Sequence, residues 1–225
     1  MRAAAIVLAA GSGARLGLGV PKAFAPVGGR TMLELAAAAA ATVAERLVVA
    51  VPPGEEGRAT ELLAGVGRPA GVVAGGKTRQ ASVRAALAAV PPEAEAVLCH
   101  DAARPFASPA LFEAVLGALE EADGAVPVVP IPDTVKVVEG GWVVETLPRE
   151  RLGAAQTPQG FRAGPLREAH GRAFAAGLAF TDDAAVLEWA GFRVRVVPGE
   201  PGNFKITTAE DLRRAEAFAA GMLRG

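Results

Sequence analysis

The stretch from residue 3 to residue 24, AAAIVLAAGSGARLGLGVPKAF, joins a short apolar run to a glycine-rich loop that ends near a lysine. The first six residues are apolar and bounded by a turn signal, which predicts a buried strand. Gly11 and Gly13 follow, and the loop also carries two cations, Arg15 and Lys22. Glycines let backbone N–H groups approach an anion, and consecutive amides make an anion-binding concavity. The stretch therefore predicts a strand and a loop that bind an anion with several charges.

Two better-known phosphate loops do not fit this stretch. A P-loop requires G-x-x-x-x-G-K-[ST], but Leu18 stands five residues after Gly13, and Lys22 has no glycine before it and no Ser or Thr after it. A dinucleotide fingerprint requires G-x-G-x-x-G, and Leu16 occupies the place of the third glycine. Taken alone, the loop is equally compatible with a flexible turn whose cations are solvated. The rest of the chain has to decide.

Composition limits the classes of protein that the chain can represent. Its 225 residues, 51% of them hydrophobic, predict one domain over residues 1–225 with a sizeable core. No apolar run is long enough to predict a membrane span. The net charge of −1 and the lack of an aromatic-studded basic patch argue against a nucleic-acid partner. The single cysteine, Cys99, excludes an internal disulfide framework and indicates a reducing compartment, so we expect the protein in the cytoplasm.

Short apolar runs alternate with helical patterns along the chain. This alternation predicts an α/β fold, Rossmann-like, with a mainly parallel sheet flanked by helices. In such sheets ligands bind beyond the carboxyl ends of the strands. Three of the helices have a clear start, at Thr31 with Glu34, at Ser108 with Pro109, and at Thr208. The predicted strands are 3–8, 46–51, 71–74, 96–100, 124–129, 193–197 and 204–206.

One region breaks the alternation. Residues 133–146, DTVKVVEGGWVVET, contain two β-branched runs joined at Gly140 and Gly141, which is typical of a hairpin. An isolated two-stranded ribbon is marginally stable in water, so it needs a surface to pack on. We therefore predict a protruding β-hairpin arm over residues 133–152 that pairs two chains in a homodimer.

Several polar motifs follow predicted strands. Gly75, Gly76, Arg79 and Ser82 stand at the entry to a helix, where backbone amides favour an anion. Asp101 and Arg104 come directly after the strand 96–100 in the motif HDAARP. Thr134 lies in PIPDTVK, Arg149 precedes RLGAAQTPQGF, and Lys205 lies in NFKITTAEDL just before the last helix.

These motifs together resemble one family. LAAGxGxRxG…PKxF, GGxxRxxSV, HDAARP, DTVK, TPQ-x-F, TDDA and N-x-KIT occur in the order and near the spacing of the cytidylyltransferases that join 2-C-methyl-D-erythritol 4-phosphate to CTP in non-mevalonate isoprenoid synthesis. The first motif is shared by nucleotidyltransferases at large, and HDAARP with GGxxRxxSV narrows the resemblance. One departure is that Leu147 and Pro148 precede Arg149, where the family commonly has Val-Asp.

The resemblance implies a set of site residues. Arg15, Lys22 and Lys205 would be catalytic, and Asp101 would be the ligand of Mg²⁺. The nucleotide would be bound by Ala9, Ala10, Gly11, Gly13, Gly75, Gly76, Arg79, Ser82, Asp101 and Ala102. The acceptor, methylerythritol phosphate, would be bound by Thr134, Arg149, Thr157 and Thr181.

The residue types suit nucleotidyl transfer. A sugar phosphate is already ionised near neutral pH, so its oxygen can attack the α-phosphorus in line without a general base. Positioning and charge stabilisation then lower the barrier. Mg²⁺ is usually held by few carboxylates together with phosphate oxygens, and Asp101 is the candidate ligand.

Some of these residues also have a structural interpretation. Asp101 can cap a turn, and Lys205 can be a surface lysine. Arg104 can orient its loop instead of touching a ligand. His100 can be a buried histidine of the core, and Trp142 can be a residue of a subunit interface. Two alternatives to the implied function stay open: the same chemistry on another polyol phosphate such as ribitol 5-phosphate, and a nucleotide-binding regulator without catalysis.

Overall fold

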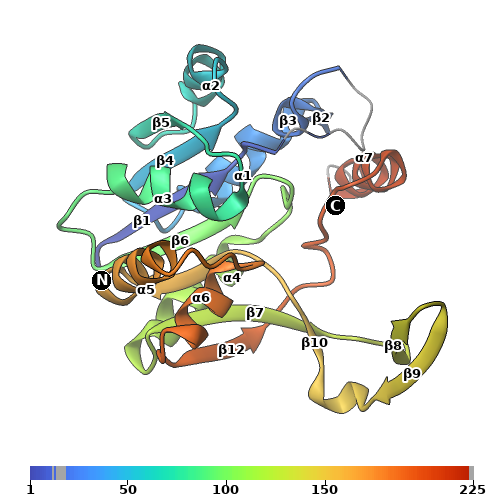
Figure 1. Ribbon diagram of the computed structural model, residues 1–225. Helices are drawn as coiled ribbons and strands as arrows, with labels where there is room; N and C mark the ends of the chain where they lie inside the picture. The colour runs from blue at the N-terminus through green and yellow to red at the C-terminus, as the bar shows by residue number, and fades with distance from the viewer. Residues whose placement is uncertain (12, 14–18, 223–225) are drawn as a thin grey trace.

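The computed structural model describes residues 1–11, 13 and 19–222, and a central sheet of eight strands organises them (Figure 1). The strand order is β10-β7-β11-β6-β1-β4-β5, and β12 also pairs with β7. The strands are β1 (Ala3–Leu8), β4 (Arg46–Val51), β5 (Ala70–Ala74), β6 (Ala96–Asp101), β7 (Gly124–Pro130), β10 (Gly153–Ala155), β11 (Gln159–Arg162) and β12 (Val194–Pro198). Six of the seven predicted strands are confirmed to within one residue.

The sheet is mainly parallel, as predicted. β6, β1, β4 and β5 run parallel to one another, and β12 runs parallel to β7. β10 and β11, which the sequence did not predict, are antiparallel to their neighbours. They run back into the sheet after the chain leaves β7, and strands that return without a helical crossover pair antiparallel.

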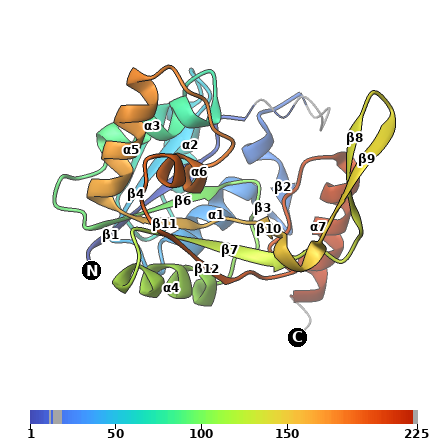
Figure 2. The same cartoon turned by 60° about the horizontal axis from the view of Figure 1, so that its bottom comes forward.

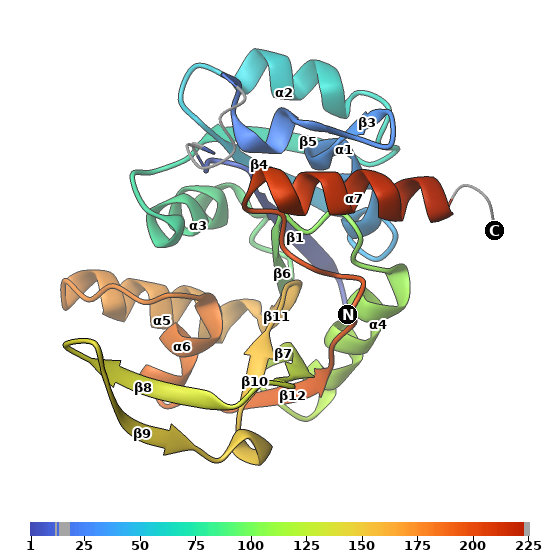
Figure 3. The same ribbon diagram turned by 90° about the vertical axis from the view of Figure 1, so that its right-hand side faces the viewer.

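Helices cover both faces of the sheet. Alternate residues of β1 face opposite sides, so Ala5 and Val7 pack with α1, α2 and α4, while Ala4 and Ile6 pack with α3, α5 and α6. Figure 3 shows the two helical layers on either side of the sheet. The helices are α1 (Met32–Ala40), α2 (Glu56–Leu63), α3 (Arg79–Ala89), α4 (Pro109–Gly117), α5 (Ala163–Ala175), α6 (Asp183–Trp189) and α7 (Ala209–Met222), with the 3-10 turns η2 (Lys22–Phe24), η3 (Ala118–Glu120) and η4 (Arg149–Arg151).

The predicted helix starts are confirmed. Thr31 and Glu34 form a reciprocal capping box at α1. Ser108 caps α4, with Pro109 in its first turn. At α7 the Thr208 hydroxyl accepts from the Asp211 amide, and the Asp211 carboxylate accepts from the Thr208 amide.

The prediction of a strand at residues 204–206 is wrong. This segment crosses the end of β6, where the Ile206 amide donates to the Ala103 carbonyl at 2.9 Å. Ile206 is buried against α7 and the small hairpin of β2 (Pro26–Val27) and β3 (Arg30–Thr31), while Lys205 between the two apolar residues is exposed. The alternating pattern therefore reflects a segment with one face on an apolar cluster, outside any sheet.

The arm is a two-stranded ribbon outside the main sheet. β8 (Val135–Glu139) pairs antiparallel with β9 (Trp142–Leu147), and both turn glycines have positive φ, 54° at Gly140 and 86° at Gly141. Figure 2 shows the ribbon extending away from the body of the protein. Trp142 is 78% exposed and Val143 is 61% exposed.

Candidate active site

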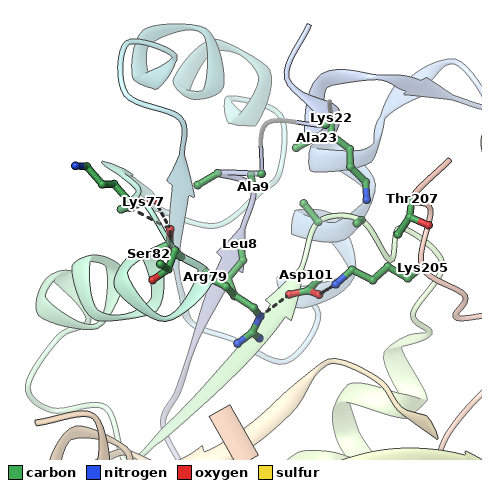
Figure 4. A pocket seen from close by; sticks show the side chains of 17 residues that line it. Leu8, Ala9, Lys22, Ala23, Lys77, Arg79, Ser82, Asp101, Lys205 and Thr207 are labelled. Carbon is green, nitrogen blue, oxygen red and sulfur yellow. Dashed lines mark hydrogen bonds and ion pairs between the residues drawn. The ribbon is translucent and has the colours of Figure 1, made fainter. Parts of the chain in front are cut away.

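A cavity of about 600 Å³ opens at the carboxyl edge of the sheet, where β1 and β6 end. Its walls come from the end of β1, the η2 turn, the start of α3, the end of β6 and the segment before α7 (Figure 4). The lining residues are Leu8, Ala9, Ala10, Gly11, Gly13, Lys22, Ala23, Gly76, Lys77, Thr78, Arg79, Ser82, Asp101, Ala102, Ala103, Lys205 and Thr207. Most of the residues predicted to bind the nucleotide therefore meet in one place, and Arg15 lies outside the described residues.

The first wall is the described part of the glycine loop. Gly13 has a φ of +67°, and a Cβ built there would lie 2.6 Å from Cβ of Lys22, so the loop closes against η2 only with glycine at this position. At the other end of this wall, the Ala102 amide donates to the Leu8 carbonyl at 3.0 Å and joins the ends of β6 and β1. Lys22 lines the cavity on the side opposite the start of α3 (Figure 4).

The second wall is the start of α3. The Thr78 side chain caps the helix by accepting from the Ala81 amide. The Ser82 hydroxyl donates to the Thr78 carbonyl at 2.9 Å and accepts from the Gly76 amide at 3.1 Å. Ser82 thus shapes the turn before α3. Gly75 lies outside the lining, and a Cβ there would lie 2.4 Å from Cβ of Ala10.

Asp101 stands between two cations at the floor of the cavity. Its Oδ1 lies 3.2 Å from Arg79 Nε, and its Oδ2 lies 2.6 Å from Lys205 Nζ. Burial by itself would raise the pKa of Asp101, but the charges of Arg79 and Lys205 outweigh burial and hold it well below its usual range. The carboxylate is therefore ionised, and it pairs with Arg79 and Lys205 in the cavity lining instead of capping a turn.

The cavity is cationic. Its described lining contains Lys22, Lys77, Arg79 and Lys205 against the single carboxylate of Asp101. Figure 4 shows Lys22 pointing toward the space beside Lys205 and Asp101, whereas Lys77 points away from it. Such an excess of positive charge in a concave site suits a polyanionic ligand.

A buried hydrogen-bonded chain supports Asp101 from behind. The Asp101 amide donates to Thr157 Oγ1 at 3.0 Å, and this hydroxyl donates to His100 Nδ1 at 3.0 Å. His100 Nε2 in turn donates to the Arg104 carbonyl at 3.1 Å. Burial lowers the pKa of His100 to about 4, so it is a neutral core histidine, as expected.

Thr157, which was predicted to contact the acceptor, lies behind Asp101. Thr157 is 5% exposed, it does not line the cavity, and its hydroxyl is engaged by Asp101 and His100. Its position next to the site therefore reflects support of the Asp101 backbone.

Arg104 has the structural role that the sequence left open. Its Nη1 donates to the Asn203 carbonyl at 2.7 Å, and its Nη2 donates to the Ala155 carbonyl at 3.2 Å. The side chain thus ties the loop after β6 to β10 and to the segment that carries Lys205.

The remaining residues predicted for the acceptor lie apart from the cavity of their own chain. Thr134 is exposed at the base of the arm, and Thr181 is exposed in the loop before α6. Arg149 is exposed in η4, and its guanidinium donates to the Pro132 carbonyl at 2.6 Å. A single chain therefore assembles the nucleotide side of the predicted site but not the acceptor side.

Some lining residues were not predicted from the sequence. Thr207 follows Lys205 by two positions, and alternate residues of an extended segment share a side, which was an available signal. Lys77 and Thr78 fill the gap between the predicted residues Gly76 and Arg79. Ala103, Ala23 and Leu8 line the cavity next to predicted residues and carry no chemical signal of their own.

No group of three or more His, Cys, Asp or Glu side chains able to hold a metal ion occurs among residues 1–11, 13 and 19–222. Within the same ranges, no helix is long and apolar enough to cross a membrane. A metal in the cavity would therefore have to take most of its ligands from a bound molecule, with Asp101 as the protein carboxylate.

The model of one protein family, 2-C-methyl-D-erythritol 4-phosphate cytidylyltransferase, matches residues 3–220. The chain belongs to this family. It is therefore a nucleotidyltransferase, and the fold, the cationic cavity and the glycine loop agree with membership of the cytidylyltransferase family.

Individual relatives agree with the family model. The chain is 49% identical over 217 residues to 2-C-methyl-D-erythritol 4-phosphate cytidylyltransferase of Deinococcus radiodurans, covering 96% of this chain and 89% of the relative. It is 47% identical to a bifunctional enzyme IspD/IspF of Anaeromyxobacter dehalogenans, covering 96% of this chain but 57% of that longer protein. The crystal structure of the cytidylyltransferase from Thermus thermophilus superposes with a TM-score of 0.83 at 43% identity, covering 98% of this chain and 100% of that one.

Proposed function

We propose that the chain transfers the cytidylyl group of CTP to the phosphate of 2-C-methyl-D-erythritol 4-phosphate. The products are 4-diphosphocytidyl-2-C-methyl-D-erythritol and pyrophosphate. The observation that carries this proposal is a cavity that brings together Lys22 and Asp101, with Asp101 paired to Lys205 and Arg79. Family membership supplies the reaction, and it does not favour the alternative acceptor ribitol 5-phosphate.

The reaction requires charge stabilisation more than proton transfer. An oxygen of the acceptor phosphate forms a bond to the α-phosphorus, and the bond between that phosphorus and the bridging oxygen breaks to release pyrophosphate. The attacking oxygen is already ionised, so a general base is unnecessary. His100 agrees with this view, because both of its ring nitrogens are engaged and it lies outside the cavity lining.

Lys22 and Lys205 are the side chains that we assign to charge stabilisation. Negative charge builds on the phosphate oxygens as pyrophosphate departs, and fixed cations in a partly enclosed site stabilise it. Lys205 is held by Asp101 at 2.6 Å, so its ammonium is oriented before the substrate arrives. We assign the triphosphate and the cytosine to the amides of residues 10, 11 and 13 and to the segment from Gly76 to Ser82. The Ala9 amide, also predicted for this role, is not available, because it donates to the Ala50 carbonyl at 2.8 Å.

Mg²⁺ is the proposed cofactor. One carboxylate in the cavity fits an ion that takes its other ligands from phosphate oxygens and water, and Asp101 would hold it. When bound, the ion would neutralise charge on the triphosphate. The prediction is that Asp101→Ala abolishes the response of the rate to added Mg²⁺, whereas a near-normal Mg²⁺ titration would remove Asp101 from this role.

We further propose that the acceptor side is completed by a second copy of the chain. Thr134 and Arg149 flank the arm, lie outside the cavity of their own chain, and are exposed. The arm exposes Trp142 and Val143, which a partner would cover. A homodimer joined by the arms would bring these residues to the partner's cavity, and Thr181 would complete the acceptor contacts. The cytoplasmic location predicted from Cys99 is part of this proposal.

Coupled measurement of pyrophosphate release tests the reaction. We expect turnover with CTP and methylerythritol phosphate, strong preference for CTP over ATP, GTP and UTP, and loss of turnover in EDTA. Equal turnover with ribitol 5-phosphate would support that compound as the acceptor and contradict the proposed specificity. CTP binding without turnover on any polyol phosphate would support the nucleotide-binding regulator.

A further inference from the structure

Arg79 pairs with two acidic side chains, Asp101 at the end of β6 and Asp183 at the start of α6. Its Nε donates to Asp101 Oδ1 at 3.2 Å, and its Nη1 donates to Asp183 Oδ2 at 2.8 Å. Its remaining nitrogen, Nη2, is buried and makes no hydrogen bond to any described residue. The two carboxylates therefore fix the orientation of the guanidinium at the floor of the cavity.

Asp183 is the more deeply buried of the two carboxylates that pair with Arg79. It is 1% exposed, and its second oxygen accepts from Nε2 of His170, also 1% exposed, at 3.1 Å. Burial would raise the pKa of Asp183, but Arg79 and His170 outweigh burial and lower it. The carboxylate is thus an ionised group beneath the cavity with defined partners on both oxygens.

The TPQ motif completes a closed ring of contacts. Thr157 holds the Asp101 amide, and two residues later Gln159 Oε1 accepts from the Asp183 amide at 3.2 Å. Arg79 then joins the Asp101 and Asp183 side chains. Four motifs that are distant in sequence therefore form one network around Arg79, and Asp183 is the charged member that does not line the cavity.

We propose that Asp183, held by His170, is a positioning residue that keeps Arg79 shared between two carboxylates and so leaves Asp101 Oδ2 to Lys205. This inference rests on the proposed function, because Lys205 is the group whose placement matters for turnover. An arginine readily binds one carboxylate through two parallel hydrogen bonds. Without Asp183, Arg79 would turn both donors to Asp101 and compete with Lys205 at 2.6 Å.

The decisive experiment compares Asp183→Asn with Asp182→Asn. Both variants delete one negative charge at the start of α6, but Asp182 caps the helix and accepts from Gln159 without touching Arg79. We expect Asp183→Asn to lower kcat at least tenfold at saturating substrates, and Asp182→Asn to change it less than twofold. An equal kcat for the two variants would overturn the proposal.

A double-mutant cycle separates positioning from general loss of structure. In an Arg79→Lys background the cost of Asp183→Asn should shrink to twofold or less, because the guanidinium through which Asp183 acts is gone. The same tenfold loss in both backgrounds would show that Asp183 supports the fold alone, and would overturn the proposal.

His170 provides a second test if Asp183→Asn does not fold. His170→Phe removes the donor to Asp183 and should lower kcat about threefold to tenfold, whereas His170→Gln offers an amide donor near the same place and should restore most of it. Equal activity of the two variants would overturn the role of His170. Absence of turnover in the wild-type protein would instead contradict the proposed function, and calorimetric titration with CTP would then compare Asp183→Asn with Asp182→Asn directly.

Discussion

The cavity and the arm differ in how completely one chain builds them. Residues around the cavity are held by strands whose faces are both covered, and Asp101 has a partner for each oxygen and for its amide. The arm is a pair of strands outside the main sheet, with Trp142 78% exposed and Thr134 and Arg149 facing solvent at its base. The cavity is thus built within one chain, whereas the arm presents an uncovered surface, and the proposed second subunit would cover that surface.

The largest expected effect follows from removing a cavity lysine. Lys22→Ala and Lys205→Ala should each lower kcat by about 2–4 kcal/mol in transition-state stabilisation, the scale of a lost electrostatic donor. Steady-state kinetics with both substrates varied measure this effect. Arg213→Ala on α7 is the control, because the exposed Arg213 side chain pairs with Glu210 and does not line the cavity, and its kcat should stay within about twofold. A raised KM for CTP with intact kcat would make the cavity lysines ground-state anchors.

Mixing two inactive variants tests whether the arm completes the partner's site. Arg149→Ala and Lys22→Ala subunits should each be nearly inactive alone. After exchange of an equal mixture, about half of the dimers are heterodimers, and each has one site with both halves intact, so activity should rise toward a quarter of wild type. Pyrophosphate release after subunit exchange measures the recovery.

Two results would contradict the proposal that Arg149 of one subunit acts at the cavity of its partner. Mixing that restores no activity would place Arg149 at its own chain's site or outside catalysis, in keeping with its contact to the Pro132 carbonyl. Sedimentation as a monomer at assay concentration would exclude the shared site before any mixing.

The packing of the cavity wall predicts an effect on stability. Gly75→Ala places a Cβ 2.4 Å from Cβ of Ala10 and 3.2 Å from the Val51 carbonyl, and such overpacking costs about 1–3 kcal/mol. Gly11→Ala is the control, because its Cβ meets no described atom within 4 Å. Chemical denaturation should show a lower midpoint for Gly75→Ala alone. Equal midpoints would show that the wall is looser than the cavity geometry indicates.

The smallest effect is a pH dependence of stability that originates behind Asp101. Burial lowers the pKa of His100 from 6.5 to about 4, so the unfolded chain takes up this proton at higher pH than the folded one. Stability should therefore fall as pH decreases through this window, by on the order of 1–2 kcal/mol between pH 7 and pH 5. Urea unfolding of wild type and His100→Gln at both values measures it, and identical pH slopes would contradict the assignment.

Local sequence patterns were sufficient for most of the framework. Strands such as β1 and β4 have the predicted bounds, because a short apolar run between turn residues is typical of a buried strand. The helix caps at Thr31 and Ser108 involve residues three positions apart and are likewise legible in the sequence. The segment 204–206 misled because an extended stretch on an apolar cluster has the same alternation as a strand.

The site likewise has features that local sequence patterns predict and features that depend on long-range contacts. The sequence by itself determined which motifs carry the cations, the glycines and Asp101, because these chemical types sit in short patterns at strand ends. Only the tertiary structure decided that Thr157 supports Asp101 from behind, that Arg104 ties loops together, and that Asp183 shares Arg79 with Asp101. These contacts join residues from 22 to 104 positions apart. Their partners are set by strand order and burial, which no local pattern of residues encodes.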